Sequence, residues 1–472
     1  MGLKRRHKKK NNQKFDPKRL VKLDHKRKCF VVDETPRYPI IATPRQLQKR
    51  FHYYSESESE SEELSSDAEF NTGYMVSSLT ASKELIRMSS SSSDSGFEGG
   101  GTAPANPKKM LETSFTYAQY QRTGKFMPPA MTLPHFKTYI VDDFHFLTVL
   151  GTGSFGKVYL AELRNTEYYY AVKCLKKDVL IRNDDVDCPF TERKVLTMGT
   201  AHPYLCHLFC TFQTESHLFY VMEYLSGGDL MFHIQVTGRF TEYQAKFFGA
   251  EIVSGLKFLH KKGIIYRDLK LDNILLDFDG HVRIGDFGMC KLQIYLDRTA
   301  ESFCGTPDYI SPEIIRGQKY NQMTDWWSFG VLLYEMLTCQ TPFSGCDEDA
   351  LFWSICYESP WYPFYLSDDA VNILGKLLDK NPNTRLGLPN SPLGEIKENV
   401  FFHEIDWKKL ERRQLESPFK PEIKHPLDTR YFDRAYTREK VRLPSTETYQ
   451  IKAMDQEKFK EFSYTNPNVM AT

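Results

Sequence analysis

The sequence has no long apolar segment and no closely paired cysteines. No uninterrupted apolar run approaches the ~20 residues that span a bilayer, and the N-terminus lacks the apolar core of a signal peptide. The 10 cysteines are scattered without a C-x-x-C pair, so neither a disulfide framework nor a zinc module is indicated. These absences predict a soluble intracellular protein, cytoplasmic and with nuclear or membrane-surface association left open.

Charge is unevenly distributed, although its sum is close to zero. The formal net charge is +1, yet residues 1–50 carry 17 Lys and Arg against 4 Asp and Glu, and residues 51–100 carry 2 against 10. A basic head therefore precedes an acidic segment. Over the whole chain 41% of residues are hydrophobic and 14% aromatic, which is enough to fill a sizeable core.

Residues 1–143 have the composition of a region without a packed core. The first 28 residues hold basic clusters with few large apolar side chains, and the runs S-E-S-E-S-E-S-E-E and S-S-S-S-S-D-S further on are of low complexity. We predict that this region is mostly disordered. The basic residues within positions 1–50 could contact anionic lipid or nucleic acid, or could form only a solvated charged tail.

One stretch, residues 266–288, carries the polar groups needed to move a phosphoryl group. It reads Y-R-D-L-K-L-D-N-I-L-L, a polar turn and H-V-R-I-G-D-F-G, so two polar loops adjoin two short runs of β character. Such a transfer requires an aligned acceptor hydroxyl, a metal against the phosphates and neutralisation of charge. Asp268 would deprotonate the hydroxyl, and Lys270 would lie against the moving phosphate. Asn273 and Asp286 offer the oxygen ligands that Mg²⁺ prefers.

A glycine-rich loop lies upstream of that stretch. Gly151, Gly153 and Gly156 interrupt a strand pattern that resumes at Val158, and Lys173 follows the last glycine by 17 residues. A dinucleotide-binding loop would be followed by a helix, whereas this loop is followed by more strand. Because glycine lacks a Cβ, such a loop can turn tightly and bring its N–H groups to phosphate oxygens. We interpret the loop as a flap over nucleotide phosphates.

Together these motifs resemble the glycine-rich loop, catalytic loop and D-F-G segment of eukaryotic protein kinases. The runs Y-R-D-L-K-L-D-N and C-G-T-P-D-Y-I, with a tail containing F-K-E-F-S-Y, are most similar to the AGC group and within it to the novel, delta- or theta-like class of protein kinase C. The resemblance covers about residues 144–468. Tyr266 replaces the usual histidine of the catalytic loop. This substitution affects a residue with a packing role and leaves Asp268 in place.

The resemblance implies an α+β fold of two lobes. A small β-rich lobe would span residues 144–225, a large helical lobe 226–404, and an AGC-type C-terminal tail 405–472. The implied activity is transfer of the γ-phosphate of ATP, with Mg²⁺, to Ser or Thr hydroxyls of proteins. A pseudokinase, which is a scaffold of the same fold without chemistry, is the alternative. A second alternative gives the main role to the basic head.

The resemblance also assigns a nucleotide site. Lys173 would contact the α and β phosphates and be held by Glu192, for which a solvated surface pair is the alternative. The main chain of Glu223 and Leu225 would read the adenine edge. The whole set comprises Leu150, Gly151, Gly153, Ser154, Gly156, Val158, Ala171, Lys173, Glu192, Met222, Glu223, Leu225 and Leu275.

Two regulatory phosphorylation sites follow from the resemblance. Ser302, just before F-C-G-T-P, would carry a phosphate that pairs with Arg267 and is added by an upstream activating kinase. Ser463 would be the phosphoacceptor of the tail, where Phe459 and Phe462 would dock on the small lobe.

Further residues are expected to hold the large lobe in its active arrangement. Thr306 would help position Asp268, and Asp325 would brace the catalytic loop. Glu313, in S-P-E, should pair with Arg385 in N-P-N-T-R-L-G.

Three acids indicate a preference for basic substrates. Asp229, Asp272 and Glu335 match acidic positions that line the peptide groove of basophilic relatives. Carboxylates there would favour Arg or Lys near the target Ser or Thr through charge-assisted pairing. Ordinary surface charges are the alternative. The expected partners are therefore protein substrates with basic residues near the phosphoacceptor, and the protein is expected to be a monomer.

The sequence departs from the family pattern in two places. The turn site of the tail, where the family has Ser or Thr after leucine, aligns with Pro444, so Ser445 substitutes or that phosphorylation is absent. No Cys/His spacing of a diacylglycerol-binding C1 module and no C2-like strand series precedes the kinase motifs. The sequence therefore predicts a protein kinase C-like chain without C1 and C2 modules and without control by diacylglycerol.

Overall fold

The computed structural model describes residues 138–153, 156–387, 393–446, 449, 451 and 454–466. The predicted disorder, the basic head and both serine-rich runs lie in residues 1–137 and so outside the described residues. Within the described ranges, no helix is both long enough and apolar enough to cross a membrane.

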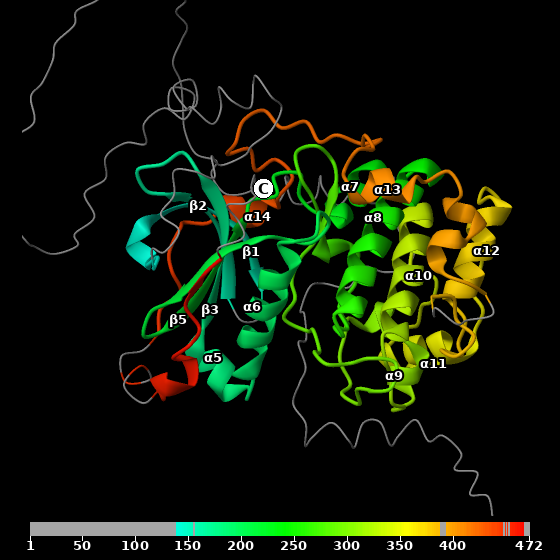
Figure 1. Cartoon of the computed structure of the whole chain (residues 1–472), viewed down its shortest axis with the longest axis horizontal. Coiled ribbons are helices and arrows are strands. Elements are labelled where there is room, and N and C mark those ends of the chain that lie inside the picture. Colours follow the sequence, from blue (N-terminus) through cyan, green and yellow to red (C-terminus); the bar gives the residue numbers. More distant parts are fainter. Residues whose placement is uncertain are drawn as a thin grey trace, which may run out of the picture. The chain divides into compact units, whose positions relative to one another are not determined.

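The small lobe is built on a six-stranded antiparallel sheet with the order β1-β2-β3-β5-β4-β8 (Figure 1). Its last strand comes from the tail and pairs with the edge strand β4. Helices α5 (Lys177–Arg182) and α6 (Asp187–Gly199) follow β3. The strands are β1 (Phe144–Gly153), β2 (Gly156–Leu163), β3 (Tyr169–Lys176), β4 (Leu208–Gln213), β5 (His217–Glu223) and β8 (Tyr464–Thr465).

Alternation along β3 decides which of its side chains face the nucleotide site. Tyr170, Val172 and Cys174 are buried in the small-lobe core, while Ala171 and Lys173 between them remain partly exposed. Successive side chains of a strand point to opposite faces of the sheet. Ala171 and Lys173 therefore share the face that is turned away from this core.

The large lobe is helical, as predicted. Its central helix α10 is buried along nearly its whole length, and α8 packs against it. The helices are α7 (Leu230–Thr237), α8 (Glu242–Lys261), α9 (Pro312–Ile315), α10 (Met323–Thr338), α11 (Glu348–Tyr357) and α12 (Asp368–Leu377). A two-stranded hairpin, β6 (Ile274–Leu276) and β7 (Val282–Ile284), lies between α8 and α9 in the chain.

Helix α8 illustrates how local sequence sets an element. Thr241 accepts a hydrogen bond from Gln244 N at 3.3 Å, and the Gln244 side chain accepts one from Thr241 N at 3.0 Å. This reciprocal capping satisfies two of the N–H groups that a helix start leaves unpaired. The apolar residues at helical spacing within α8 are all buried, namely Phe247, Phe248, Ile252, Leu256 and Leu259.

The tail returns from the large lobe to the small lobe and passes the hinge, residues 224–229, which joins β5 to α7. It contains the short helices α13 (Trp407–Glu411) and α14 (Arg434–Thr437), and α14 packs against β1. Gly228 at the hinge has φ +69°, and a Cβ there would lie 2.5 Å from the carbonyl oxygen of Tyr431. Only glycine permits this approach.

Single turns of 3-10 helix connect the larger elements. They are η2 (Val141–Asp143), η3 (Leu271–Asn273), η4 (Pro307–Tyr309), η5 (Ile396–Glu398), η6 (Val400–Phe402) and η7 (Gln456–Phe459). The turn η3 lies in the predicted catalytic loop. The turn η7 begins the terminal segment of the tail.

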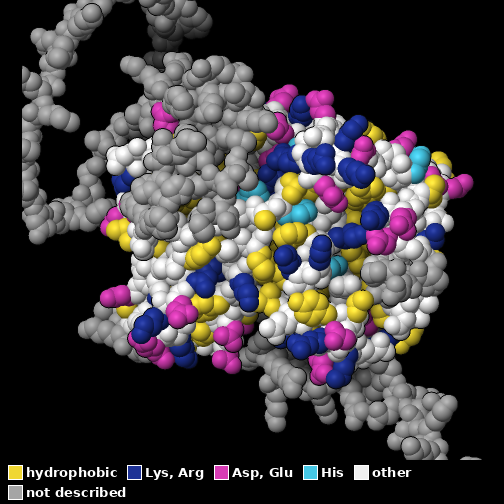
Figure 2. Space-filling view, viewed as in Figure 1, with side chains coloured by type: hydrophobic (Ala, Val, Ile, Leu, Met, Phe, Trp, Pro, Cys, Tyr) yellow, Lys and Arg dark blue, Asp and Glu magenta, His cyan; other side chains and the backbone are white. Residues whose placement is uncertain are grey.

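Charges of both signs are mixed on the face shown in Figure 2. Lys and Arg side chains alternate there with Asp and Glu, and hydrophobic side chains lie between them.

Candidate active site

The hairpin β6–β7 brings the two predicted metal ligands together. Ile274 pairs with Ile284, and Gly285 N donates to the carbonyl oxygen of Asn273 at 2.9 Å. Asn273 and Asp286 therefore lie at the same end of the hairpin. Asp286 has φ +45°, a strained conformation of the kind that clusters at functional sites.

Asp268 is held by three neighbours. Asn273 Nδ2 donates to Asp268 Oδ2 at 2.9 Å, and Thr306 Oγ1 donates to Asp268 Oδ1 at 2.8 Å. Lys270 Nζ lies 3.5 Å from Asp268 Oδ2. Burial raises the pKa of Asp268, and Lys270 opposes that rise. The arrangement suits a general base, because the carboxylate is oriented and partly desolvated.

Lys173 joins two acids from different lobes. Its Nζ lies 2.6 Å from Glu192 Oε1 on α6 and 2.9 Å from Asp286 Oδ1. Burial opposes the charge of Lys173, but Asp286 and Glu192 outweigh it and raise the pKa of the lysine. Because Glu192 is only 3% exposed, the alternative of a solvated surface pair is wrong. The lysine is therefore held in place and ionised.

Asp286 and Asn273 fit a hard cation. Lys173 holds the pKa of Asp286 below its ordinary value, so the carboxylate is ionised. The Asp286 side chain is 52% exposed, which leaves it accessible to a ligand. Asn273 donates a hydrogen bond from its amide nitrogen to Asp268, which leaves its side-chain carbonyl oxygen as a metal ligand. A carboxylate and an amide oxygen form a donor set typical of Mg²⁺ held jointly with phosphates.

The sheet of the small lobe brings several of the predicted nucleotide-binding residues into neighbouring positions. Val158 pairs with both Gly151 and Lys173, and Ala171 pairs with Met222. Leu275 forms an isolated bridge with Asp229 at the end of the hinge. The apolar members of the predicted set are at least partly buried, namely Leu150, Val158, Ala171, Met222, Leu225 and Leu275.

The glycines of the loop have different roles. A Cβ at Gly156 would lie 1.7 Å from the carbonyl oxygen of Cys174, so β3 excludes any larger residue there. Gly151 and Gly153 have open space where a Cβ would be. Ser154 lies outside the described residues. The strand that continues after Gly156 is β2, as predicted, and excludes the dinucleotide-binding alternative.

Asp325 braces the catalytic loop, as predicted. Its carboxylate accepts hydrogen bonds from Tyr266 N and Arg267 N, each at 2.9 Å, and from His260 Nε2 at 2.7 Å. Tyr266, at the departure from the family pattern, is fully buried and donates its hydroxyl to the carbonyl oxygen of Gly285 at 2.5 Å. The tyrosine thus links the catalytic loop to the segment that carries Asp286.

The activation segment, residues 289–310 between D-F-G and S-P-E, meets the catalytic loop at Arg267. Arg267 Nη1 donates to Ser302 Oγ at 2.7 Å and to the Tyr320 hydroxyl at 3.1 Å, and Nε donates to the carbonyl oxygen of Met289 at 2.6 Å. Ser302 therefore lies beside the arginine with which its phosphate was predicted to pair.

A buried ion pair holds the end of the activation segment. Arg385 and Glu313 form two hydrogen bonds, of 2.8 and 2.9 Å, and neither side chain is more than 1% exposed. Arg385 also donates to the carbonyl oxygens of Met323 and Asp379. The predicted pair is present.

Asp272 lies close enough to both other predicted groove acids to influence their pKa values. Asp229 caps α7 by accepting a hydrogen bond from Phe232 N at 2.7 Å, and Glu335 accepts one from the Tyr309 hydroxyl. Burial raises the pKa of Asp229 to about 6 and that of Glu335 to about 7. The charge of Asp272 contributes to both rises.

The terminal segment of the tail docks on the small lobe, as predicted. Phe459 and Phe462 are fully buried, and the Phe462 ring meets Tyr220 edge to face at 5.2 Å. The carbonyl oxygen of Phe462 accepts a hydrogen bond from Thr211 at 2.6 Å. Ser463, the predicted phosphoacceptor, is exposed.

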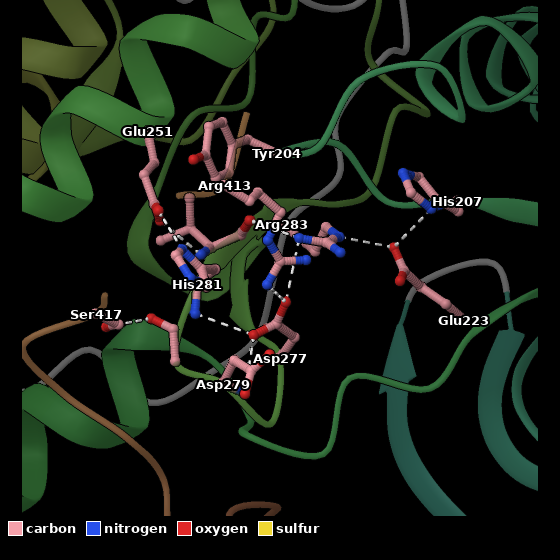
Figure 3. A network of polar contacts seen from close by, with 12 residues as sticks. Tyr204, His207, Glu223, Glu251, Asp277, Asp279, His281, Arg283, Arg413 and Ser417 are labelled. Carbon is pink, nitrogen blue, oxygen red and sulfur yellow. Dashed lines mark hydrogen bonds and ion pairs between the residues drawn. The ribbon is translucent and has the colours of Figure 1, made fainter. Parts of the chain in front are cut away.

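Sequence reasoning missed the role of the Glu223 side chain. It assigned Glu223 a main-chain contact with adenine, whereas Arg283 Nε donates to Glu223 Oε1 at 3.0 Å in a buried polar network (Figure 3). Asp277 and Arg413 belong to the same network. The only sequence signal was a charged residue, Arg283, in the otherwise apolar β7.

Residues 144–402 match the protein kinase domain family, and residues 423–464 match the protein kinase C terminal domain. The chain belongs to the protein kinase family, and its tail is of the protein kinase C type.

Curated relatives are protein kinases C. A protein kinase C delta type homolog of Drosophila melanogaster is 68% identical over 358 residues, covering 76% of this chain and 53% of the relative. Protein kinase C delta type of Mus musculus is 54% identical over 327 residues, covering 69% of this chain and 48% of the relative. Protein kinase C-like 1 of Caenorhabditis elegans is 52% identical over 334 residues, covering 70% and 47%. The chain thus spans about half the length of these relatives.

Proposed function

We propose that the chain is a serine/threonine protein kinase of the protein kinase C kind, which transfers the γ-phosphate of ATP to protein hydroxyls. The observation that supports this most is that Lys173 forms ion pairs with both Glu192 and Asp286, while Asp268 nearby is oriented by its own hydrogen bonds. A scaffold without chemistry has no need for this arrangement. The names of the relatives support the same activity.

Each of these residues has a separate role in the transfer of phosphate. Lys173 binds the α and β phosphates and is kept in place by Glu192. Asp268 orients the acceptor hydroxyl and accepts its proton as the bond to phosphorus forms, while the bridging oxygen leaves with ADP. Lys270 donates to Thr306 Oγ1 at 3.2 Å and neutralises charge on the transferred group.

Asp286 and Asn273 would hold Mg²⁺ against the phosphates. When bound, the metal supplies positive charge that offsets the charge developing on the phosphate oxygens.

The substrates proposed are proteins with Arg or Lys near the phosphorylated Ser or Thr. Asp229, Asp272 and Glu335 would receive those cations through charge-assisted hydrogen bonds. Residues 1–50 are proposed to contact anionic lipid or nucleic acid, and the protein to associate with the nucleus or a membrane surface. Both proposals rest only on the excess of basic residues in this segment. A monomer is proposed.

Regulation by phosphorylation is proposed at Ser302 and Ser463. A phosphate on Ser302 would meet Arg267, whose Nη1 already contacts the serine hydroxyl. An upstream kinase would add it. Ser463 is accessible at the end of the docked tail segment.

The test is the substitution Asp268→Asn. We expect transfer of phosphate to an Arg-containing Ser peptide to fall by about 10²- to 10⁴-fold, because the general base is lost while shape is kept. The measurement is incorporation of labelled phosphate by purified protein, with Asp349→Asn, at an exposed residue of α11, as the matched control. Transfer that survives Asp268→Asn unchanged would refute the assignment of the base, and a wild-type chain without transfer would favour the pseudokinase.

A further inference from the structure

A chain of charged side chains runs from the tail to the hinge between the lobes (Figure 3). Arg413 Nη2 donates to Asp277 Oδ2 at 2.6 Å, and the same oxygen lies 3.2 Å from Arg283 Nη1. Arg283 Nε in turn donates to Glu223 Oε1 at 3.0 Å. Cations and anions alternate along this chain, so each member is held by its neighbours.

The hinge end of this series of charged side chains lies next to two segments that carry residues of the proposed nucleotide site. Glu223 is the last residue of β5 and leads into the hinge. Its carboxylate accepts a hydrogen bond from His207 N at 2.9 Å, and its main-chain N–H donates to the carbonyl oxygen of His207 at 3.1 Å. Arg283 lies in β7, which leads directly to Asp286. A shift of Arg283 therefore affects the segment beside adenine and the segment beside the phosphates.

The middle of the chain is buried and fixed. Asp277 and Arg283 are each 5% exposed. Asp277 Oδ1 accepts hydrogen bonds from His281 N at 3.0 Å and Asp279 N at 3.1 Å, so the carboxylate is anchored to the β6–β7 turn. Because charges interact strongly where water is excluded, removal of one charged side chain changes the electrostatic attraction between the remaining ones.

The tail end of the chain is held by close contacts with the same turn. Ser417 Oγ donates to the carbonyl oxygen of Gly280 at 2.8 Å, and a Cβ at Gly280 would lie 1.7 Å from the carbonyl oxygen of Phe419. Arg413 itself has φ +54°, which is unfavourable for a residue with a side chain. The tail thus accepts a strained conformation at the residue that presents its guanidinium to Asp277.

We propose that Arg413 is a positioning residue that acts through Asp277 and Arg283 to hold the hinge, and thereby slows the release of nucleotide. Without Arg413, Asp277 attracts Arg283 more strongly, and the hydrogen bond from Arg283 to Glu223 weakens. The effect on nucleotide release rests on the proposed function, whereas the coupling between tail and hinge does not. A residue that merely fastened the tail would leave the hinge unchanged.

The experiment compares Arg413→Ala with Arg412→Ala in the full chain. Arg412 is the exposed neighbour and serves as the matched control. We expect Arg413→Ala to speed dissociation of fluorescently labelled ADP by about threefold to tenfold, which is the scale on which one residue of such a chain modulates coupling. Hydrogen exchange at the amides of residues 223–226, measured without nucleotide, should also accelerate. Arg412→Ala should leave both rates at the wild-type values.

Two further variants separate positioning from simple stability. Arg413→Lys keeps the charge and should restore the dissociation rate to within about twofold of wild type. Arg413→Ala combined with Glu223→Gln should release ADP no faster than the single variant with the faster release, because both substitutions interrupt the same series of charged contacts. Wild-type hinge exchange and ADP release in Arg413→Ala, or additive effects in the double variant, would overturn the proposal. A wild-type chain that binds ADP but transfers no phosphate would instead refute the proposed function.

Discussion

At the scale of single residues, burial and neighbouring charge decide which active-site carboxylates are ionised near neutral pH. Lys173 keeps the pKa of Asp286 below its ordinary value. Burial raises the pKa of Asp229 to about 6 and of Glu335 to about 7. The carboxylate proposed to hold Mg²⁺ is therefore ionised throughout the physiological range, whereas the two acids proposed to line the substrate groove change charge within it.

This difference predicts how substrate recognition depends on pH. Above their raised pKa values Asp229 and Glu335 are ionised and attract a basic side chain, and below them they are neutral. The KM for a peptide with Arg near the target Ser should therefore fall by about tenfold as the pH rises from 6 to 8. Initial rates over that range test it. The matched peptide with Ala in place of Arg should show a much smaller change, and parallel curves for the two peptides would contradict the assignment.

Sequence reasoning predicted the residues that stand in recognisable motifs, and it missed the side-chain partner of Glu223, which no motif marks. Asp268, Asn273 and Asp286 stand within one short stretch, so their roles could be predicted from order and residue type. The Glu223 side chain meets an arginine 60 residues further along the chain. No periodicity in the sequence relates such positions, because only the tertiary fold brings the end of β5 and β7 together.

At the scale of elements, the tail completes the small lobe. Strand β8 extends the sheet at β4, and η7 supplies Phe459 to the core. Lys177, only 1% exposed, donates to Gln213 and to Gln456 of the tail and lies over the Phe459 ring at 5.0 Å. The docked segment therefore combines buried aromatic surface with directional hydrogen bonds.

Truncation of the second anchor should show how much this docking contributes. Phe462→Ala removes a fully buried ring, so we expect the free energy of unfolding to fall by about 3–5 kcal/mol. Urea unfolding monitored by circular dichroism measures it. Phe364→Ala is the control, because that ring is 98% exposed and its loss should change stability by less than about 0.5 kcal/mol. Similar effects of the two substitutions would mean that the anchor contributes little.

Helix α8 could be predicted from its sequence, and β8 could not. Thr241, Gln244 and the apolar spacing that follows are local signals of a helix start and of a buried helix face. Tyr464 and Thr465 form a strand too short to show a period of two. Their pairing with β4 depends on the docking of the two phenylalanines, which is a tertiary effect.

At the scale of the whole molecule, Arg267 connects three distant parts of the large lobe. Its main chain bonds Asp325 of α10, and its side chain reaches Ser302 and Tyr320 around the activation segment. A phosphate on Ser302 would add about 1.5 to 2 negative charges opposite this guanidinium. The arrangement favours a switch that orders the activation segment without altering the core.

Removal of that phosphoacceptor should lower activity more than stability. We expect Ser302→Ala to reduce kcat by at least about tenfold, with the free energy of unfolding unchanged within about 0.5 kcal/mol. Kinetic assays and urea unfolding measure the two quantities. Phosphatase-treated wild type should match the variant, and Ser359→Ala, at an exposed serine, should not differ from untreated wild type. Full activity of Ser302→Ala would exclude this site as the switch.

The two-lobed architecture could be predicted because its motifs come in a fixed order along the chain. The path of the tail across the hinge could not, since it depends on approaches such as that of Gly228 to Tyr431, which have no counterpart in local sequence. The same holds for the chain of charges that Arg413 completes.

The strand contributed by the tail has a practical consequence for any fragment of this protein. The match to the protein kinase domain ends at residue 402, before the tail begins its return. A fragment cut there would leave the edge of β4 without its partner β8 and would uncover the apolar site filled by Phe459 and Phe462. Unpaired strand edges are templates for aggregation. The smallest fragment that remains monodisperse at high concentration should therefore extend to Asn466, the residue that hydrogen-bonds to Phe209 after β8.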